Sequence, residues 1–131
     1  MIGIDTNVLA RYIAEDDAAQ SAAAARVIES LSAESPGFVP LVVIAELVWV
    51  LQFSYQFNKR GIADVIEKLL RSAELMLENA EIVAQALREF RRSRADFADC
   101  LIERSAHAAG CQHTVTFDKR AVSLAGMRLI Q

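Results

Sequence analysis

The 131-residue chain is long enough to bury a core and fits one domain. Hydrophobic residues make up 53% of it, with two Pro and five Gly, so we expect a compact globular protein rather than a disordered one. Fourteen basic and seventeen acidic side chains give a net charge of −3, which argues against a general nucleic-acid coat protein, a class that is basic. An enzyme with a cluster of acids behind a local basic rim is not excluded.

The cellular compartment is expected to be the cytoplasm. Cys100 and Cys111 do not make a secreted disulfide framework, and the N-terminus has neither the basic nor the apolar region of a signal peptide. The apolar stretch 41–53 is shorter than the roughly 20 residues that span a bilayer, and it contains Glu46. A buried helix is therefore expected there, with no membrane partner.

The first half of the chain alternates short apolar runs with helical periodicity. We expect a strand over residues 1–5, helices over 8–14 and 18–32, a turn at 35–37, a strand at 38–39 and a helix over 41–55. Thr6 or Asn7 is the expected N-cap of the first helix.

The second half continues the alternation after an expected break at Arg60 and Gly61. We expect helices over residues 62–72, 80–92, 96 or 97 to 109, and 119–124, with strands over 75–77, 113–117 and 127–130. Short apolar strands that alternate with helices favour a parallel sheet covered by helices on both faces.

Four carboxylates fall at strand ends or helix starts of this pattern. Asp5 ends the first strand and Asp118 follows the strand 113–117, whereas Glu46 and Asp99 lie in the first turns of their helices. Right-handed crossovers place the strand ends that feed helices at one edge, where open α/β sheets bind ligands. Helical side chains lean toward the helix N-terminus, so we expect all four acids to converge there.

A cluster of four acids needs a compensating charge. Helix dipoles offset only about 0.3–1 kcal/mol each, so either some acids stay protonated or a divalent cation binds. Ligands that are all oxygen suit Mg²⁺ or Mn²⁺ rather than zinc. Such an ion activates water and binds phosphoryl oxygens, which points to phosphodiester chemistry.

Each acid also has a structural interpretation. Asp5 and Asp118 suit helix caps or turns, and Asp96 suits a cap that leaves Asp99 at the third helical position. Glu46 is the hardest to explain structurally, because a buried unpaired carboxylate is costly. Asp96 remains open as a cap or an additional ligand.

Four segments together resemble the PIN-domain ribonucleases, and specifically the VapC-type toxins. They are IGIDTNVLAR at 2–11, VPLVVIAELVWVL around Glu46, DFADCLIERSAHAAGC at 96–111 and TVTFDKRA at 114–121. The resemblance covers nearly the whole chain in order. It implies one PIN domain over residues 1–131, folded as an α/β/α sandwich around a central parallel sheet of about four to five short strands.

The resemblance also implies a site and an activity. Asp5, Glu46, Asp99 and Asp118 match the acidic quartet that holds Mg²⁺ or Mn²⁺. The polar positions that support this site are matched by Thr6, Asn7 and Thr116. The implied activity is endoribonucleolytic cleavage of cellular RNA by a metal-activated water. Family members are commonly homodimeric toxins that a cognate VapB-type antitoxin holds inactive.

Basic residues adjoin two of the acidic segments. Arg88, Arg91, Arg92 and Arg94 precede Asp96 in the chain, and Lys119 and Arg120 follow Asp118. Contacts to RNA phosphates come mostly from such residues, so Arg91, Arg92, Lys119 and Arg120 are candidate RNA-binding residues. The alternative for the arginine cluster is an exposed helix end that favours cations.

Aromatic residues are more frequent around the helix 41–55 than one core-facing side needs. Trp49, Phe53, Tyr55 and Phe57 either belong to the core or pack in part against an antitoxin or a second protomer.

The cysteines and histidines match no common zinc motif in their spacing, so we expect core thiols and ordinary histidines on the surface or in a strand. These residues are Cys100, His107, Cys111 and His113.

Two rival functions remain open. One is an acidic-site phosphatase that acts on small molecules, although no second Asp lies two residues after Asp5. The other is an α/β module that binds metal without turnover.

Overall fold

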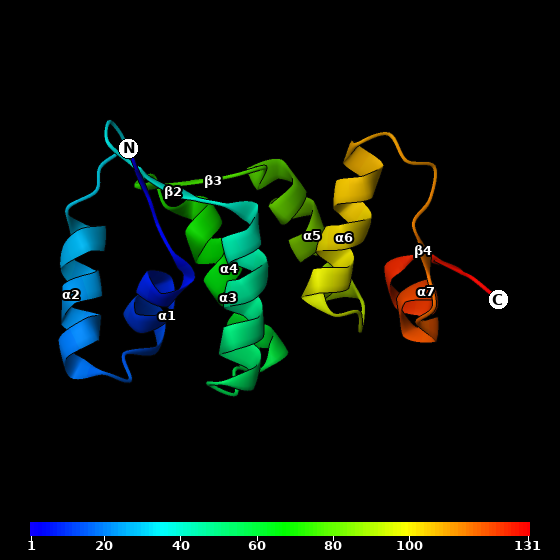
Figure 1. Ribbon diagram of the computed structural model, residues 1–131, viewed down its shortest axis with the longest axis horizontal. Coiled ribbons are helices and arrows are strands. Elements are labelled where there is room, and N and C mark those ends of the chain that lie inside the picture. Colours follow the sequence, from blue (N-terminus) through cyan, green and yellow to red (C-terminus); the bar gives the residue numbers. More distant parts are fainter. The chain divides into compact units, whose positions relative to one another are not determined.

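The computed structural model describes the backbone of all 131 residues and every side chain except those of Ser123 and Leu124. The chain divides into two compact units, Met1–Ala80 and Glu81–Gln131 (Figure 1). Each unit has its own helices and its own small sheet of parallel strands.

The first unit alternates strands with helices, and all of its strand pairings are parallel. Its elements are β1 Ile2–Gly3, α1 Thr6–Ala14, α2 Ala18–Glu29, β2 Gly37–Val39, α3 Leu41–Phe53, α4 Lys59–Arg71 and β3 Leu75–Leu77. The strand order is β1-β2-β3, with Ile2 opposite Gly37 and Phe38 opposite Met76. Every strand but the last therefore feeds helices that return the chain to a parallel neighbour.

The core of the first unit lies among α1, α3 and α4, and α1 packs against both α2 and α3. Leu9 of α1, Leu47 and Leu51 of α3, and Ile66 of α4 are fully buried. Leu47 and Leu51 are one turn apart on one side of α3, so this side faces the core. The packing of α1 on α3 also fixes the positions of candidate site residues, because α1 begins at such residues and α3 contains one.

The second unit contains α5 Ala80–Arg92 except for its first residue, α6 Phe97–Ala108, β4 Val115–Thr116, α7 Lys119–Ala125 and β5 Arg128–Leu129. The two strands pair in parallel, with Val115 opposite Arg128. The rings of Phe90 and Phe97 meet edge to face at 5.6 Å and join α5 to α6. The C-terminus of α6 is followed by Gly110, whose φ of 95° lies in the left-handed region that glycine adopts readily.

The predicted alternation of helices with short parallel strands is confirmed. All five expected strands are present, three in the sheet of the first unit and two in that of the second. No helix among the residues that the structure describes is long and apolar enough to cross a membrane.

Two local predictions are wrong for reasons of helix capping. The expected break at Arg60 and Gly61 lies inside α4, because the Asn58 side chain accepts a 2.8 Å hydrogen bond from the Gly61 N–H and starts the helix earlier. Neither Thr6 nor Asn7 is the N-cap of α1. Asp5 occupies that position in an extended conformation, and the Thr6 hydroxyl bonds elsewhere.

The interpretation that all the aromatic residues around α3 belong to the core is also wrong. Trp49 and Phe53 are each 59% exposed, whereas Tyr55 and Phe57 are half-buried. The period of α3 explains this, because Leu47 and Leu51 take the core-facing positions.

We expect Gly37→Ala to lower the free energy of unfolding by about 1–3 kcal/mol. A Cβ at this buried position in β2 would lie 2.8 Å from Cγ1 of Ile4 and 2.9 Å from Cδ1 of Leu31. Urea denaturation followed by circular dichroism measures the change. Gly3→Ala in β1 is the matched control, because nothing lies within 4 Å of its added Cβ. Equal destabilisation by the two substitutions would contradict this account of the packing.

Candidate functional site

Asp5 lies at the junction between β1 and α1. The N–H of Ile4 still donates to the Phe38 carbonyl at 2.8 Å, and the next residue leaves the sheet. The Asp5 carbonyl accepts from the N–H of Val8 at 3.2 Å and so starts the helix, while its carboxylate makes no capping hydrogen bond. The side chain of Asp5 is exposed, so the predicted function of this residue as a helix cap does not engage its carboxylate.

Glu46 is tied to the start of α1 by a hydrogen bond. The hydroxyl of Thr6 donates to Oε1 of Glu46 across 40 residues of sequence. Thr6 is buried, whereas Glu46 is exposed in the middle of α3. The expectation of a buried unpaired Glu46 is wrong, because this position faces away from the leucines of the core and its carboxylate has a partner. The structure thus brings the predicted pair Thr6 and Glu46 together.

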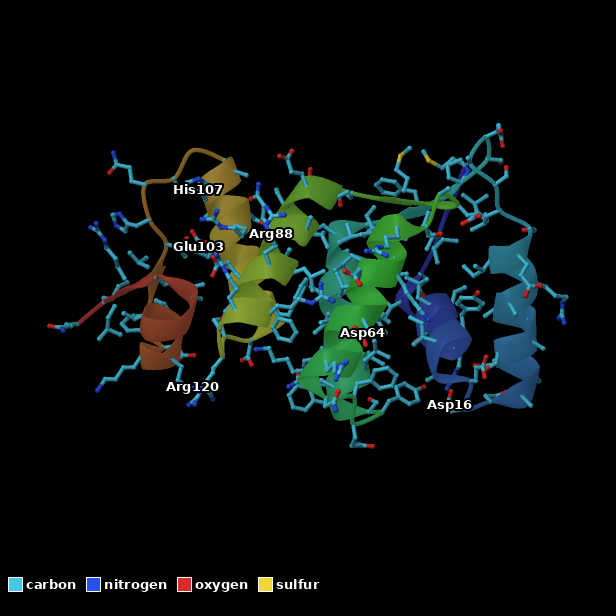
Figure 2. The ribbon with its side chains drawn as sticks, turned by 180° about the vertical axis from the view of Figure 1, so that it is seen from behind. Asp16, Asp64, Arg88, Glu103, His107 and Arg120 are labelled. Carbon is cyan, nitrogen blue, oxygen red and sulfur yellow. The ribbon has the colours of Figure 1, made fainter. Side chains whose placement is uncertain are left out.

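A second polar cluster ties the same two helices at their other ends. Arg11 of α1 donates to both oxygens of Asp16 at 2.8 and 2.7 Å and to the hydroxyl of Tyr55 at 2.9 Å. Tyr55, just beyond α3, donates to Asp16 at 3.0 Å. Figure 2 shows Asp16 at the turn between α1 and α2. This cluster is not predictable from the sequence, since Asp16 has no periodic signal that links it to Tyr55, 39 positions away.

Hydrogen bonds and burial within this cluster shift the pKa values of Asp16 and Tyr55. Hydrogen bonding to Arg11 lowers the pKa of Asp16, and burial followed by the hydrogen bond to Asp16 raises the pKa of Tyr55. At neutral pH the cluster therefore consists of a guanidinium, a carboxylate and a neutral phenol. These are the protonation states that its hydrogen bonds require.

The second unit places three carboxylates around one small hollow. Asp96, Asp99 and Asp118 line it with Arg94 and Arg120, and its volume is about 10 Å³. Asp96 occupies the N-cap position of α6 without a side-chain capping bond, which puts Asp99 at the third helical position as predicted.

Asp118 takes up a cap role in addition to lining the hollow. It is the N-cap of α7, where one carboxylate oxygen accepts from the N–H of Arg120 at 2.9 Å. The N–H of Asp118 donates to Oγ1 of Thr116 at 3.0 Å. Thr116 therefore supports the turn that orients Asp118.

Crowding of negative charge is visible at Asp99. Burial raises its pKa, the charges of Asp96 and Asp118 raise it further, and Arg120 opposes them. A bound divalent cation would relieve this repulsion, and the all-oxygen donor set fits Mg²⁺ or Mn²⁺. Within the part of the chain that the structure describes, no three His, Cys, Asp or Glu side chains are grouped closely enough to hold a metal ion.

The four predicted ligands are divided between the two units. Asp5 and Glu46 belong to Met1–Ala80, and Asp99 and Asp118 belong to Glu81–Gln131. The structure gives the positions of Asp5 and Glu46 within the first unit, and those of Asp99 and Asp118 within the second. In the first unit the polar neighbour Thr6 is engaged, whereas Asn7 is exposed at the second position of α1.

The candidate RNA-binding residues are exposed at two helix ends. Arg91 and Arg92 form the last turn of α5, where Arg92 also pairs with Glu89. Lys119 and Arg120 begin α7, where Figure 2 labels Arg120. These positions fit both phosphate contacts and the alternative of cations at a helix end.

Cysteines and histidines lie apart from any metal chemistry. Cys100 is buried, and burial raises the pKa of its thiol to about 11, so it stays a neutral core residue. His107 and His113 are exposed as expected. Cys111 is exposed too, which corrects its prediction as a core thiol, because it follows the end of α6 at Gly110.

Comparisons with known proteins give the family. A model of the PIN domain family matches residues 2–127. A VapC ribonuclease of Aquifex aeolicus (strain VF5) is 30% identical over 83 residues, which cover 63% of this chain and 62% of that relative's length. The crystal structure of VapC20 from Mycobacterium tuberculosis, described as a sarcin–ricin loop cleaving toxin, aligns with 97% of this chain and 96% of its own at 20% identity and a TM-score of 0.47. Because the family model spans nearly all of the sequence, the chain belongs to the PIN domain family.

Proposed function

We propose that this protein is a metal-dependent endoribonuclease, the toxin of a toxin–antitoxin pair, that acts on RNA in the cytoplasm. The observation that carries the proposal is the PIN family match, which contains all four predicted carboxylates. The relative named as a VapC ribonuclease supports the reaction class. Because the match spans both compact units, we propose that residues 1–131 act as one PIN domain.

The proposed ligands of Mg²⁺ or Mn²⁺ are Asp5, Glu46, Asp99 and Asp118, with Asp96 as an additional acid. A bound divalent ion supplies charge neutralisation at a phosphoryl oxygen and lowers the pKa of a bound water. The crowded acids of the second unit support this assignment, because burial and then the charges of Asp96 and Asp118 raise the pKa of Asp99, and a cation would relieve the repulsion between these charges.

Neighbouring polar groups hold these carboxylates in the proposed mechanism. The Thr6 hydroxyl occupies one oxygen of Glu46, which fixes its rotamer and leaves the other oxygen for the ion. Thr116 holds the backbone N–H of Asp118, and the Asp118 side chain keeps one oxygen outside its capping bond. Asn7, exposed beside Thr6, is proposed as a polar support of the same site.

The proposed partners are an RNA substrate, a cognate VapB-type antitoxin and a second copy of the chain in a homodimer. A groove of about 800 Å³ in the first unit suits the antitoxin, because Leu9, Ile28 and Leu69 line it from α1, α2 and α4. Its polar lining is mainly acidic, with Glu15, Glu29 and Glu74 opposed by Lys68. An amphipathic helix with a basic edge fits such a groove. None of the described residues that line this groove is a proposed metal ligand.

We expect Asp99→Asn to raise the free energy of unfolding in metal-free buffer by up to about 1 kcal/mol after allowance for solvent screening. The substitution removes one of the charges that repel each other around the hollow. Thermal denaturation with EDTA measures the gain, and added Mg²⁺ should stabilise the wild type more than the variant.

The matched control is Asp17→Asn, which makes the same change at a cap of α2 that interacts favourably with Arg11. It should bring no gain in stability. A clear loss of stability in Asp99→Asn would instead identify Asp99 as a structural residue.

Purified antitoxin-free protein is expected to cut total cellular RNA into discrete fragments with Mg²⁺ or Mn²⁺ and to leave it intact with EDTA. Asp99→Asn should reduce the rate by about 100-fold or more, because a ligand of the ion is lost. Gel electrophoresis and end mapping of the fragments measure this, with Asp17→Asn as the active control. Metal binding without cleavage of any RNA would favour the non-catalytic module, and hydrolysis of small phosphate esters alone would favour the phosphatase.

Reversal of charge at Arg91 and Arg92 is expected to weaken RNA binding and flatten its salt dependence. Each lost phosphate contact removes about 0.7 from the slope of log K against log salt for a single strand. Filter binding at several salt concentrations, with Asp99→Asn protein to prevent cleavage, measures both. Arg26→Glu with Arg71→Glu is the matched control, because these residues also lie in last turns of helices. Unchanged binding in the Arg91 and Arg92 variant would leave only the helix-end role.

A further inference from the structure

The start of α3 has no capping side chain of its own. Pro40 occupies the N-cap position, and its side chain makes no hydrogen bond there. The carbonyl of Pro40 accepts from the N–H groups of Val43 and Ile44 at 3.0 and 3.3 Å, which starts the helix. The N–H of Leu41 belongs to the first turn, where no carbonyl of the helix itself is within reach. It needs an acceptor from outside α3.

Glu78, the residue after β3, supplies this acceptor. Its Oε1 accepts from the N–H of Leu41 at 2.7 Å, across 37 residues of sequence. The backbone N–H of Glu78 donates to the carbonyl of Val39, the last residue of β2, at 2.9 Å. Glu78 therefore binds the residues on both sides of Pro40 and closes the turn from β2 into α3. We call these two hydrogen bonds the Glu78 clamp.

The first turn of α3 supports the backbone of Glu46. Within an α-helix the N–H of a residue donates to the carbonyl four positions earlier, so Glu46 depends on Val42. Val42 is 72% exposed, whereas Val43 is buried, so one side of this turn lies in solvent. If the turn frays, the N–H of Glu46 loses its acceptor.

The remainder of α3 does not depend on the Glu78 clamp. Ile44, Leu47 and Leu51 are fully buried in the core of the first unit and hold the helix beyond its first turn. Glu78 itself is exposed, so substituting its side chain removes no packing from the core. Such a substitution is therefore expected to change the order of the first turn while the fold is retained.

We propose that Glu78 is a positioning residue for Glu46. The Glu78 clamp holds the first turn of α3 and with it the backbone of Glu46, while the Thr6 hydroxyl holds the Glu46 carboxylate. A carboxylate that takes part in catalysis has to be held within about 0.5 Å of its productive position. The catalytic consequence rests on the proposed function, whereas the effect on the order of α3 does not.

Amide hydrogen exchange, followed by NMR on the full chain without metal, measures the clamp independently of catalysis. Glu78→Ala should speed exchange at Leu41 and Glu46 by about 2- to 30-fold, the range that the loss of a helix cap gives. Glu78→Gln should restore most of the protection, because its amide oxygen can accept the same N–H. The amide of Leu51 should keep its rate. Glu34→Ala, which removes an exposed acid from the turn before β2, is the matched control and should behave as the wild type.

Cleavage of RNA with Mg²⁺ then tests the positioning function. Glu78→Ala should lower kcat by about 10-fold because Glu46 is less well ordered, with KM within about 2-fold of the wild type. Glu78→Gln should recover most of kcat, and Glu34→Ala should retain all of it. A residue that only stabilises the fold would leave kcat of the folded protein unchanged.

Three results would overturn the inference. Unchanged exchange at Glu46 in Glu78→Ala would show that the first turn is held without the clamp. Faster exchange with an unchanged kcat would reduce Glu78 to a helix cap. If Glu78→Gln regained protection but stayed as impaired in kcat as Glu78→Ala, Glu78 would act through its charge and not through position. A wild type that cleaves no RNA would reject the proposed function, and the exchange rates would still decide whether Glu78 holds Glu46.

Discussion

The hydrogen bond from Thr6 to Glu46 is the interaction on which the arrangement of the first unit depends. It joins the residue that starts α1 to the middle of α3, and a typical hydrogen bond within a protein contributes about 0.5–1.5 kcal/mol to stability. Arg11 and Tyr55 tie the same helices at their other ends. Buried leucines between these two ties, Leu9 on α1 and Leu47 on α3, prevent one helix from sliding along the other. Glu46 is thereby held beside Thr6 at the start of α1, next to Asp5 in the chain.

In the second unit, the main constraint is the electrostatic repulsion between neighbouring carboxylates. Asp96, Asp99 and Asp118 come from the start of α6 and the start of α7, and Arg94 and Arg120 are the cations that line the same hollow. Helix N-termini carry partial positive charge, which makes the placement of these acids tolerable but leaves the pKa of Asp99 raised. A cation bound between these acids would relieve the repulsion and so stabilise the unit. Under the proposed function, the cost of keeping the acids together would add to the affinity for a divalent ion.

Sequence patterns predicted the order of elements well because each is encoded locally. The strands β2 and β3 and the helix α5 fall within one residue of their expected bounds, since Pro40 and the periodic apolar residues of 80–92 mark them. The start of α4 was missed because a single capping bond from Asn58 overrides the glycine at position 61. Position 99 was predicted to be the third helical residue, since Asp96 supplies the cap position in sequence. The cluster of Arg11, Asp16 and Tyr55 could not be predicted from the sequence, because only the packing of α1 on α3 brings its members together.

The prediction that Glu46 is buried was wrong, and the reason lies in the way that α3 packs against the core. An apolar run of this length predicts burial on all sides, but a helix packed against one core can bury only part of its surface. Ile44, Leu47 and Leu51 fill the core, which leaves Val42, Trp49 and Phe53 exposed. Glu46 lies among these exposed residues, so its carboxylate stays accessible although its helix is apolar. The hydrophobicity of α3 therefore reflects more than its contact with the core, since the exposed side of this helix is apolar as well.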